Sequence, residues 1–203
     1  MRQISIGARV LLLVFGVSCA SSSTKTEIQS SWTDPSVDTI RFHKAIVVFM
    51  SRDPVMRETA EVQLAGQIGP SRSVPSYTIF SDVEVQDVEA AKRKLRENGF
   101  DAAIVMRLVG NEGDVRFAAG ESYSGPYASY YGYYTWGWTA VSDPGYLKEE
   151  RSIGIRTNLY DIAADKLLWT GVSQSFNQEN TIEMVRDIAS SIREELRRKK
   201  LLP

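Results

Sequence analysis

Two short runs of consecutive apolar residues constrain the fold of this chain most strongly. Residues 45–50 and 102–106 contain no polar position. Each run is long enough for a strand, and an unbroken apolar pattern indicates a strand that is buried on both faces. Such strands are typical of parallel sheets, whose faces are covered by the helices that connect the strands. The sequence therefore predicts a parallel sheet.

The residues between these runs have helical patterns. Asp53 and Pro54 are typical of a helix start, and apolar residues at helical spacing continue to about residue 69. A short strand is predicted over 77–80. Ser81 and Glu84 have the spacing of a capping box before a second helical pattern, which ends at Asn98-Gly99. Two right-handed crossovers would then give a three-stranded parallel βαβαβ core.

The C-terminal half changes to a period of two. Residues 153–160 and 167–176 alternate between apolar and polar positions around a turn, which predicts an antiparallel hairpin. Asn180 can cap a final helix whose apolar stripe runs from Ile182 to Leu196. The predicted fold class is mixed α/β (α+β): the parallel core is extended by the hairpin, and the C-terminal helix packs on the sheet.

The first nineteen residues have the pattern of an export signal. Arg2 and Arg9 precede an apolar run over 10–17. This run is shorter than the roughly 20 residues that a transmembrane helix needs. Residues 16–19 resemble a lipobox, with Gly16 at the position where Leu is usual and Cys19 as the lipidation site. The alternative is an ordinary signal peptide that is cut near Cys19, which would leave this cysteine incidental.

Cys19 is the only cysteine, so the exported domain has no internal disulfide and depends on burial for its stability. We expect a signal peptide over 1–18, a tether and extended lead-in over 19–40, and a single domain over 41–203. Removing Arg2 and Arg9 from the 24 basic residues leaves 22 against 25 acidic ones, a formal charge of −3. This balance argues against nucleic acid as a partner.

An aromatic, glycine-rich insert occupies residues 117–146. It holds seven of the nine tyrosines and two of the four tryptophans. Aromatic side chains with a polar tip suit the binding of a sugar, a peptide or another protein. Two other interpretations are contact with lipid headgroups and a long loop whose rings cover their own domain. The candidate binding residues are Tyr123, Tyr127, Tyr130, Tyr131, Tyr133, Tyr134, Trp136 and Trp138.

The sequence carries no catalytic signature. His43 is the only histidine, so a zinc site or a Ser-His-Asp arrangement has little to be built from, and no metal or cofactor is expected. The acids Glu149 and Glu150, or Glu112 and Asp114, are adjacent or nearly adjacent carboxylates, and paired acids can cleave glycosides. Direct sequence neighbours such as Glu149 and Glu150 would face opposite ways on a strand. The simpler interpretation is that these acids are charged residues exposed to solvent.

Several of these features together resemble a family of uncharacterised proteobacterial envelope lipoproteins. The features are Trp32 with Asp34-Pro35 after the tether, Asp53-Pro54, residues 99–101, residues 143–146 and Leu168-Trp169. The resemblance implies a location on the outer membrane, facing the periplasm, and brings no catalytic residue. We therefore expect a non-enzymatic, lipid-anchored protein that binds an envelope protein or peptidoglycan through its aromatic segment. The alternatives are a structural subunit of an envelope assembly or secretion complex and a cell-wall-acting enzyme.

Overall fold

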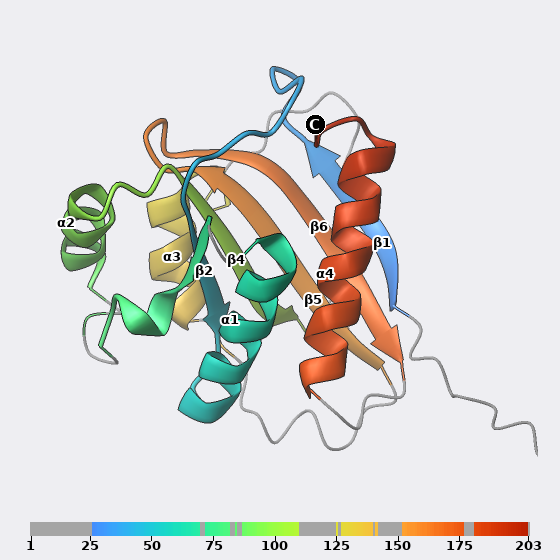
Figure 1. The fold of residues 1–203 in the computed structure, drawn as a ribbon, viewed down its shortest axis with the longest axis horizontal. Helices are drawn as coiled ribbons and strands as arrows, with labels where there is room; N and C mark the ends of the chain where they lie inside the picture. Colours follow the sequence, from blue (N-terminus) through green and yellow to red (C-terminus); the bar gives the residue numbers. More distant parts are fainter. Residues whose placement is uncertain are drawn as a thin grey trace, which may run out of the picture.

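The computed structural model describes residues 26–69, 72–81, 84, 87–109, 125, 127–139, 141, 152–176 and 181–202. Cys19, Tyr123 and the four acids considered above lie outside these residues. The described strands form one six-stranded sheet of order β1-β6-β5-β4-β2-β3 (Figure 1). In chain order the elements are β1 (Thr26–Thr33), β2 (Ala45–Met50), α1 (Pro54–Ile68), β3 (Ser73–Pro75), the 3-10 turn η1 (Ser76–Thr78), α2 (Val88–Glu97), β4 (Ala102–Val109), α3 (Tyr130–Thr139), β5 (Ser152–Asp161), β6 (Lys166–Phe176) and α4 (Thr181–Arg198).

The parallel half of the sheet confirms the predicted fold class. β2 pairs in parallel with β4 on one side and with β3 on the other, and every residue of β2 and β4 is buried. The third parallel strand is shorter and earlier than the predicted 77–80. It stops at Pro75, and the next residues form η1 because Ser76 and Tyr77 bond to Glu61 instead of extending the ladder.

The antiparallel half contains the predicted hairpin and one strand more. β5 and β6 pair over their whole length, and β1 pairs with the outer edge of β6. The sheet therefore begins within the segment that the sequence assigned to a tether and lead-in. Trp32 at the end of β1 is buried.

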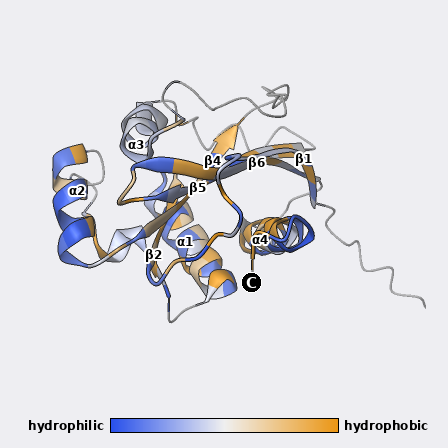
Figure 2. Cartoon of the chain, turned by 90° about the horizontal axis from the view of Figure 1, so that it is seen from above, coloured by the Kyte–Doolittle hydropathy of each residue, from blue (hydrophilic) through white to orange (hydrophobic). Residues whose placement is uncertain are grey.

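Helices cover both faces of the sheet (Figure 2). Along β2, Ala45, Val47 and Phe49 face the core beneath α1 and α4, while alternate residues face the core beneath α3. The C-terminal helix α4 packs on the sheet beside α1, as the sequence predicts. Two separate apolar layers result, and each can enclose a different site.

Capping aspartates set the starts of α1 and α2, and the sequence predicts only the first of them. Asp53 accepts hydrogen bonds from the backbone N–H groups of Val55 and Met56, so the predicted start of α1 is confirmed. The second helix begins later than the sequence indicates, because Asp87 caps α2. Ser81 and Glu84 do bond each other, but in the connection before the helix.

Glu195 joins α4 to the edge strand β1. Its carboxylate accepts a hydrogen bond from Ser31 at 2.9 Å and lies 2.6 Å from Nη2 of Arg198. Partial burial opposes ionisation, but the bonds from Arg198 and Ser31 outweigh it and hold the pKa of Glu195 below its ordinary value.

This lowered pKa gives a pH-dependent contribution to stability. The contribution is present above the ordinary carboxyl pKa of about 4.5 and is lost as the pH falls through the folded-state value. Glu195→Gln is expected to lower the free energy of unfolding by about 1 kcal/mol near neutral pH and by less in acid. Urea titrations between pH 3 and 7 measure this, with the exposed neighbour Glu194→Gln as control. A pH-independent difference would contradict it.

Candidate functional site

Within the aromatic insert, Tyr130–Thr139 form the helix α3, which the sequence does not predict. α3 begins at Tyr130, and its start is held from a distance by Asp165 in the β5–β6 turn. The Asp165 carboxylate accepts hydrogen bonds from the Ser129 hydroxyl at 2.7 Å and from the Tyr131 backbone N–H at 3.1 Å. This cap comes from a residue more than thirty positions away, so no local pattern could indicate it.

Three of the candidate binding residues belong to the core. Tyr130, Tyr133 and Tyr134 have no exposed surface, because their spacing places them on one side of α3, against the sheet. Burial raises the pKa of each phenol, so all three stay uncharged at physiological pH. In this structure they fill the core, as in the alternative in which rings cover their own domain.

The other described candidates are half-buried and each has a cation over its ring. The guanidinium carbons of Arg156 and Arg107 lie 4.8 Å from the ring centres of Tyr127 and Trp136. In the same way, Lys92 lies over the ring of Tyr131 and Arg57 lies over the ring of Trp138. Part of each ring is therefore already in contact with a cation of the protein itself. Tyr127 and Trp136 also contact each other, with ring centres 5.0 Å apart.

Two of these cations, Arg107 and Arg156, are buried arginines that lie against the rings of Trp136 and Tyr127. Arg107 of β4 and Arg156 of β5 are directly opposite in the strand register, and they are 4% and 3% exposed. Nε of Arg107 donates to the Tyr133 hydroxyl at 3.3 Å. Neither arginine has a role predicted from the sequence, although an arginine inside an apolar strand is itself an informative pattern.

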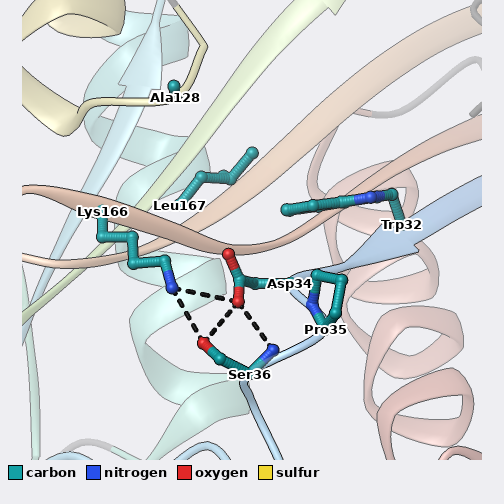
Figure 3. A pocket seen from close by; sticks show the side chains of 7 residues that line it. All are labelled: Trp32, Asp34, Pro35, Ser36, Ala128, Lys166 and Leu167. Carbon is teal, nitrogen blue, oxygen red and sulfur yellow. Dashed lines mark hydrogen bonds and ion pairs between the residues drawn. The ribbon is translucent and has the colours of Figure 1, made fainter. Parts of the chain in front are cut away.

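A polar pocket lies next to the aromatic segment, at the end of β1. Its volume is about 440 Å³, and it is open to solvent. Trp32 and Leu167 form an apolar wall, while the side chains of Asp34, Ser36 and Lys166 meet at one side (Figure 3). Ala128, just before α3, closes another part, and its carbonyl accepts from the Leu167 backbone N–H.

The polar side of the pocket is a connected network. Nζ of Lys166 lies 3.0 Å from Oδ1 of Asp34 and donates to Oγ of Ser36 at 2.8 Å. Oδ1 of Asp34 also accepts from the Ser36 hydroxyl and backbone N–H. Partial burial opposes ionisation, but these bonds hold the pKa of Asp34 below its ordinary value. The pocket thus presents a fixed carboxylate, a half-exposed ammonium group and a hydroxyl beside an indole.

His43 and a possible metal site are the remaining features considered from the sequence. The His43 side chain is fully exposed, and its Nδ1 lies 3.0 Å from Oδ2 of Asp101. Within the described ranges, no cluster of His, Cys, Asp and Glu has the composition of a metal site. No described helix combines the length and the apolar character needed to cross a membrane.

Comparison with known proteins adds a distant structural likeness. No protein-family model and no curated protein matches the chain. A Leu-to-Met variant of the PelC dodecamer from Paraburkholderia phytofirmans is similar at 12% identity and a TM-score of 0.42, covering 83% of this chain and 96% of that chain. A second PelC dodecamer from the same organism has 9% identity, a TM-score of 0.41 and the same coverage. Similarity at this level carries no functional argument, so function is argued below from the site itself.

Proposed function

We propose that this chain is a non-enzymatic protein of the bacterial cell envelope, anchored through a lipid on Cys19 to the outer membrane and facing the periplasm. It binds a glycan of the cell wall, or an envelope protein, at the pocket lined by Trp32, Asp34, Ser36 and Lys166 and at the half-buried rings beside it. The observation that carries the proposal is the combination, in one open pocket, of an indole with three convergent polar side chains.

The chemistry of the pocket suits sugar hydroxyls. The Asp34 carboxylate accepts hydrogen bonds, the Lys166 ammonium group donates them, and Ser36 does both. Trp32 and Leu167 close the apolar side of the pocket but expose only 6% and 2% of their surface, so recognition depends mainly on the polar groups. The hydrogen bonds within the network hold these side chains in place, so binding costs little further ordering of them.

The position of the pocket suits a ligand away from the membrane. Seven residue steps separate Cys19 from Thr26, and an extended chain of that length spans at most about 25 Å. β1 then runs for eight residues, or roughly 26 Å, before it reaches the pocket. An anchor at Cys19 would therefore hold the domain close to the membrane while the pocket lies at the far end of the first strand.

The anchor is tested separately from the binding. Labelled palmitate is expected to enter the protein in growing cells and to be absent from a Cys19→Ala variant. Membrane fractionation is expected to place the parent protein in the outer membrane. An unlabelled parent protein that begins at Met1 would overturn the anchor.

The binding is tested by retention on purified peptidoglycan. Lys166→Gln is expected to reduce retention by roughly tenfold, because it removes the exposed charged donor of the pocket. Lys94→Gln is the matched control, since Nζ of Lys94 also bonds one carboxylate and one neutral oxygen, but on α2. Equal retention of both variants would contradict a glycan site here, and co-purification of a stable envelope complex that both variants preserve would favour the structural-subunit alternative.

A further inference from the structure

A large apolar cavity lies on the opposite face of the sheet from the aromatic helix. Its volume is about 850 Å³, within the roughly 300–1,000 Å³ that is usual for small-molecule sites. It lies between α1, α4, the sheet and residues 40–43. Its walls and floor are formed mainly by aliphatic and thioether side chains, including Leu64, Ile68, Ile104, Met106, Ile192 and Leu196.

The rim of this cavity is positively charged. Arg41, Arg72, Arg193 and Arg197 line it, and its described lining contains no acidic residue. Within the part of the chain that the structure describes, none of these four guanidinium groups forms an ion pair. Arg72 is positioned over the ring of Phe42, with 5.7 Å between the guanidinium carbon and the ring centre. Four arginines without acidic partners attract an anionic group, because guanidinium donors bind carboxylates in a bidentate manner.

The floor of the cavity contains one buried polar group without a hydrogen-bond partner in the described part of the chain. Thr157 lies among the apolar floor residues and is 1% exposed, and its Oγ1 has no hydrogen-bond partner among the described residues. A buried hydroxyl without a partner is costly, and native proteins leave few such groups. A water molecule would satisfy this hydroxyl, whereas an alkyl chain has no atom that can.

We propose that this cavity binds a long-chain fatty acid. The alkyl chain occupies the apolar interior between α1 and α4, and the carboxylate is held at the rim by the arginines. Charge complementarity selects the acid over a neutral lipid, and burial of the alkyl chain supplies most of the affinity. The inference does not depend on the proposed function, since it concerns the other face of the sheet and none of the same residues.

The test uses a photoreactive palmitate with the protein purified as the cell makes it. After illumination, cross-links are mapped by mass spectrometry and are expected on β4 and α4, at residues such as Met106 and Ile192. Excess palmitate is expected to compete. The neutral photoreactive hexadecanol is expected to label these residues at least about tenfold less, because it lacks the charge that the arginines bind.

Two variants separate the cavity from its rim. Arg193→Gln/Arg197→Gln is expected to reduce palmitate labelling by about tenfold, whereas Arg96→Gln/Arg186→Gln removes the same charge outside the cavity and should leave it unchanged. Ala189→Phe fills the cavity and is expected to abolish labelling. If Ala189→Phe fails to fold, the arginine variants decide alone. Equal labelling by acid and alcohol, equal labelling of the two arginine pairs, or no cross-link in the cavity would overturn the proposal.

Discussion

Replacing Glu61 with alanine is expected to lower the free energy of unfolding by about 3–5 kcal/mol, the range for breaking a buried ion pair from one side. Glu61 is fully buried on α1, and its carboxylate joins three elements. Oε1 accepts from the Ser76 hydroxyl at 2.6 Å and from the Phe49 backbone N–H at 3.0 Å, and Oε2 accepts from the Tyr77 backbone N–H at 2.9 Å. Arg57, also buried, donates to Oε1 at 3.3 Å.

This network explains why β3 can end after three residues. β3 stops at Pro75, and Glu61 then supplies acceptors for β2 and for η1 at the place where the ladder ends. Burial raises the pKa of Glu61, although the bonds from Ser76 and Arg57 oppose the rise. Alanine would leave the donors of Phe49 on β2 and of Ser76 and Tyr77 on η1 without their acceptor, and the buried Arg57 without its counterion.

Chemical denaturation measures the expected loss, with Glu58→Ala as the control because Glu58 is exposed on the same helix. The two variants should differ by at least about 2 kcal/mol, since surface substitutions away from such networks change stability by only about 0.5 kcal/mol. In a double-mutant cycle, Arg57→Met and Glu61→Leu together should cost less than the sum of the single changes. A Glu61→Ala protein as stable as Glu58→Ala would show that the network contributes nothing.

Replacing Gly171 with alanine is expected to cost about 3 kcal/mol through overpacking. A methyl group built on Gly171 would lie 2.7 Å from Cζ2 of Trp169 and closer still to its Cη2. Trp169 is fully buried beneath the helices, and the two residues lie on the same face of β6, because strand side chains repeat every second position. The rigid indole has no room to move away, so the strand or the helix above it must shift.

Two comparisons identify the cause of this loss. Trp169→Phe removes the outer atoms of the indole that a Cβ at position 171 would meet, so Gly171→Ala should cost less in the Trp169→Phe background than in the parent. Gly137→Ala also meets a neighbour, but that neighbour is the end of the Met50 side chain, which can rotate away at a smaller cost. Equal losses at Gly171 in both backgrounds would show that steric overlap with Trp169 is not the cause.

The predictable parts of the fold are those in which local patterns and tertiary burial agree. The apolar runs that became β2 and β4, the alternation that became β5 and β6, and the stripe of α4 each follow the side-chain geometry of a single element. The turn at Asn98-Gly99 also follows locally, because Gly99 has a φ of +68°, which favours glycine.

The candidate site was less predictable, because its members come from distant parts of the chain. Composition singles out the aromatic segment, but it does not distinguish a ring that contacts a ligand from a ring that fills a core. Tyr133 and Trp136 are close in sequence, yet the first is fully buried and the second is half-exposed. The difference depends on which side of α3 meets the sheet, and on the Asp165 cap from another turn.

The amino-acid sequence by itself determined the types of β2, β4, β5, β6, α1, α2 and α4, the mixed α/β class and the sign of the charge, because periodicity and propensity act between residues a few positions apart. The tertiary structure alone decided that β1 joins the sheet, that three tyrosines become core residues, that Lys166 meets Asp34, and that four arginines surround one apolar cavity. These are contacts between residues far apart in the chain. Their energies depend on how helices and strands pack, and no local pattern carries that information.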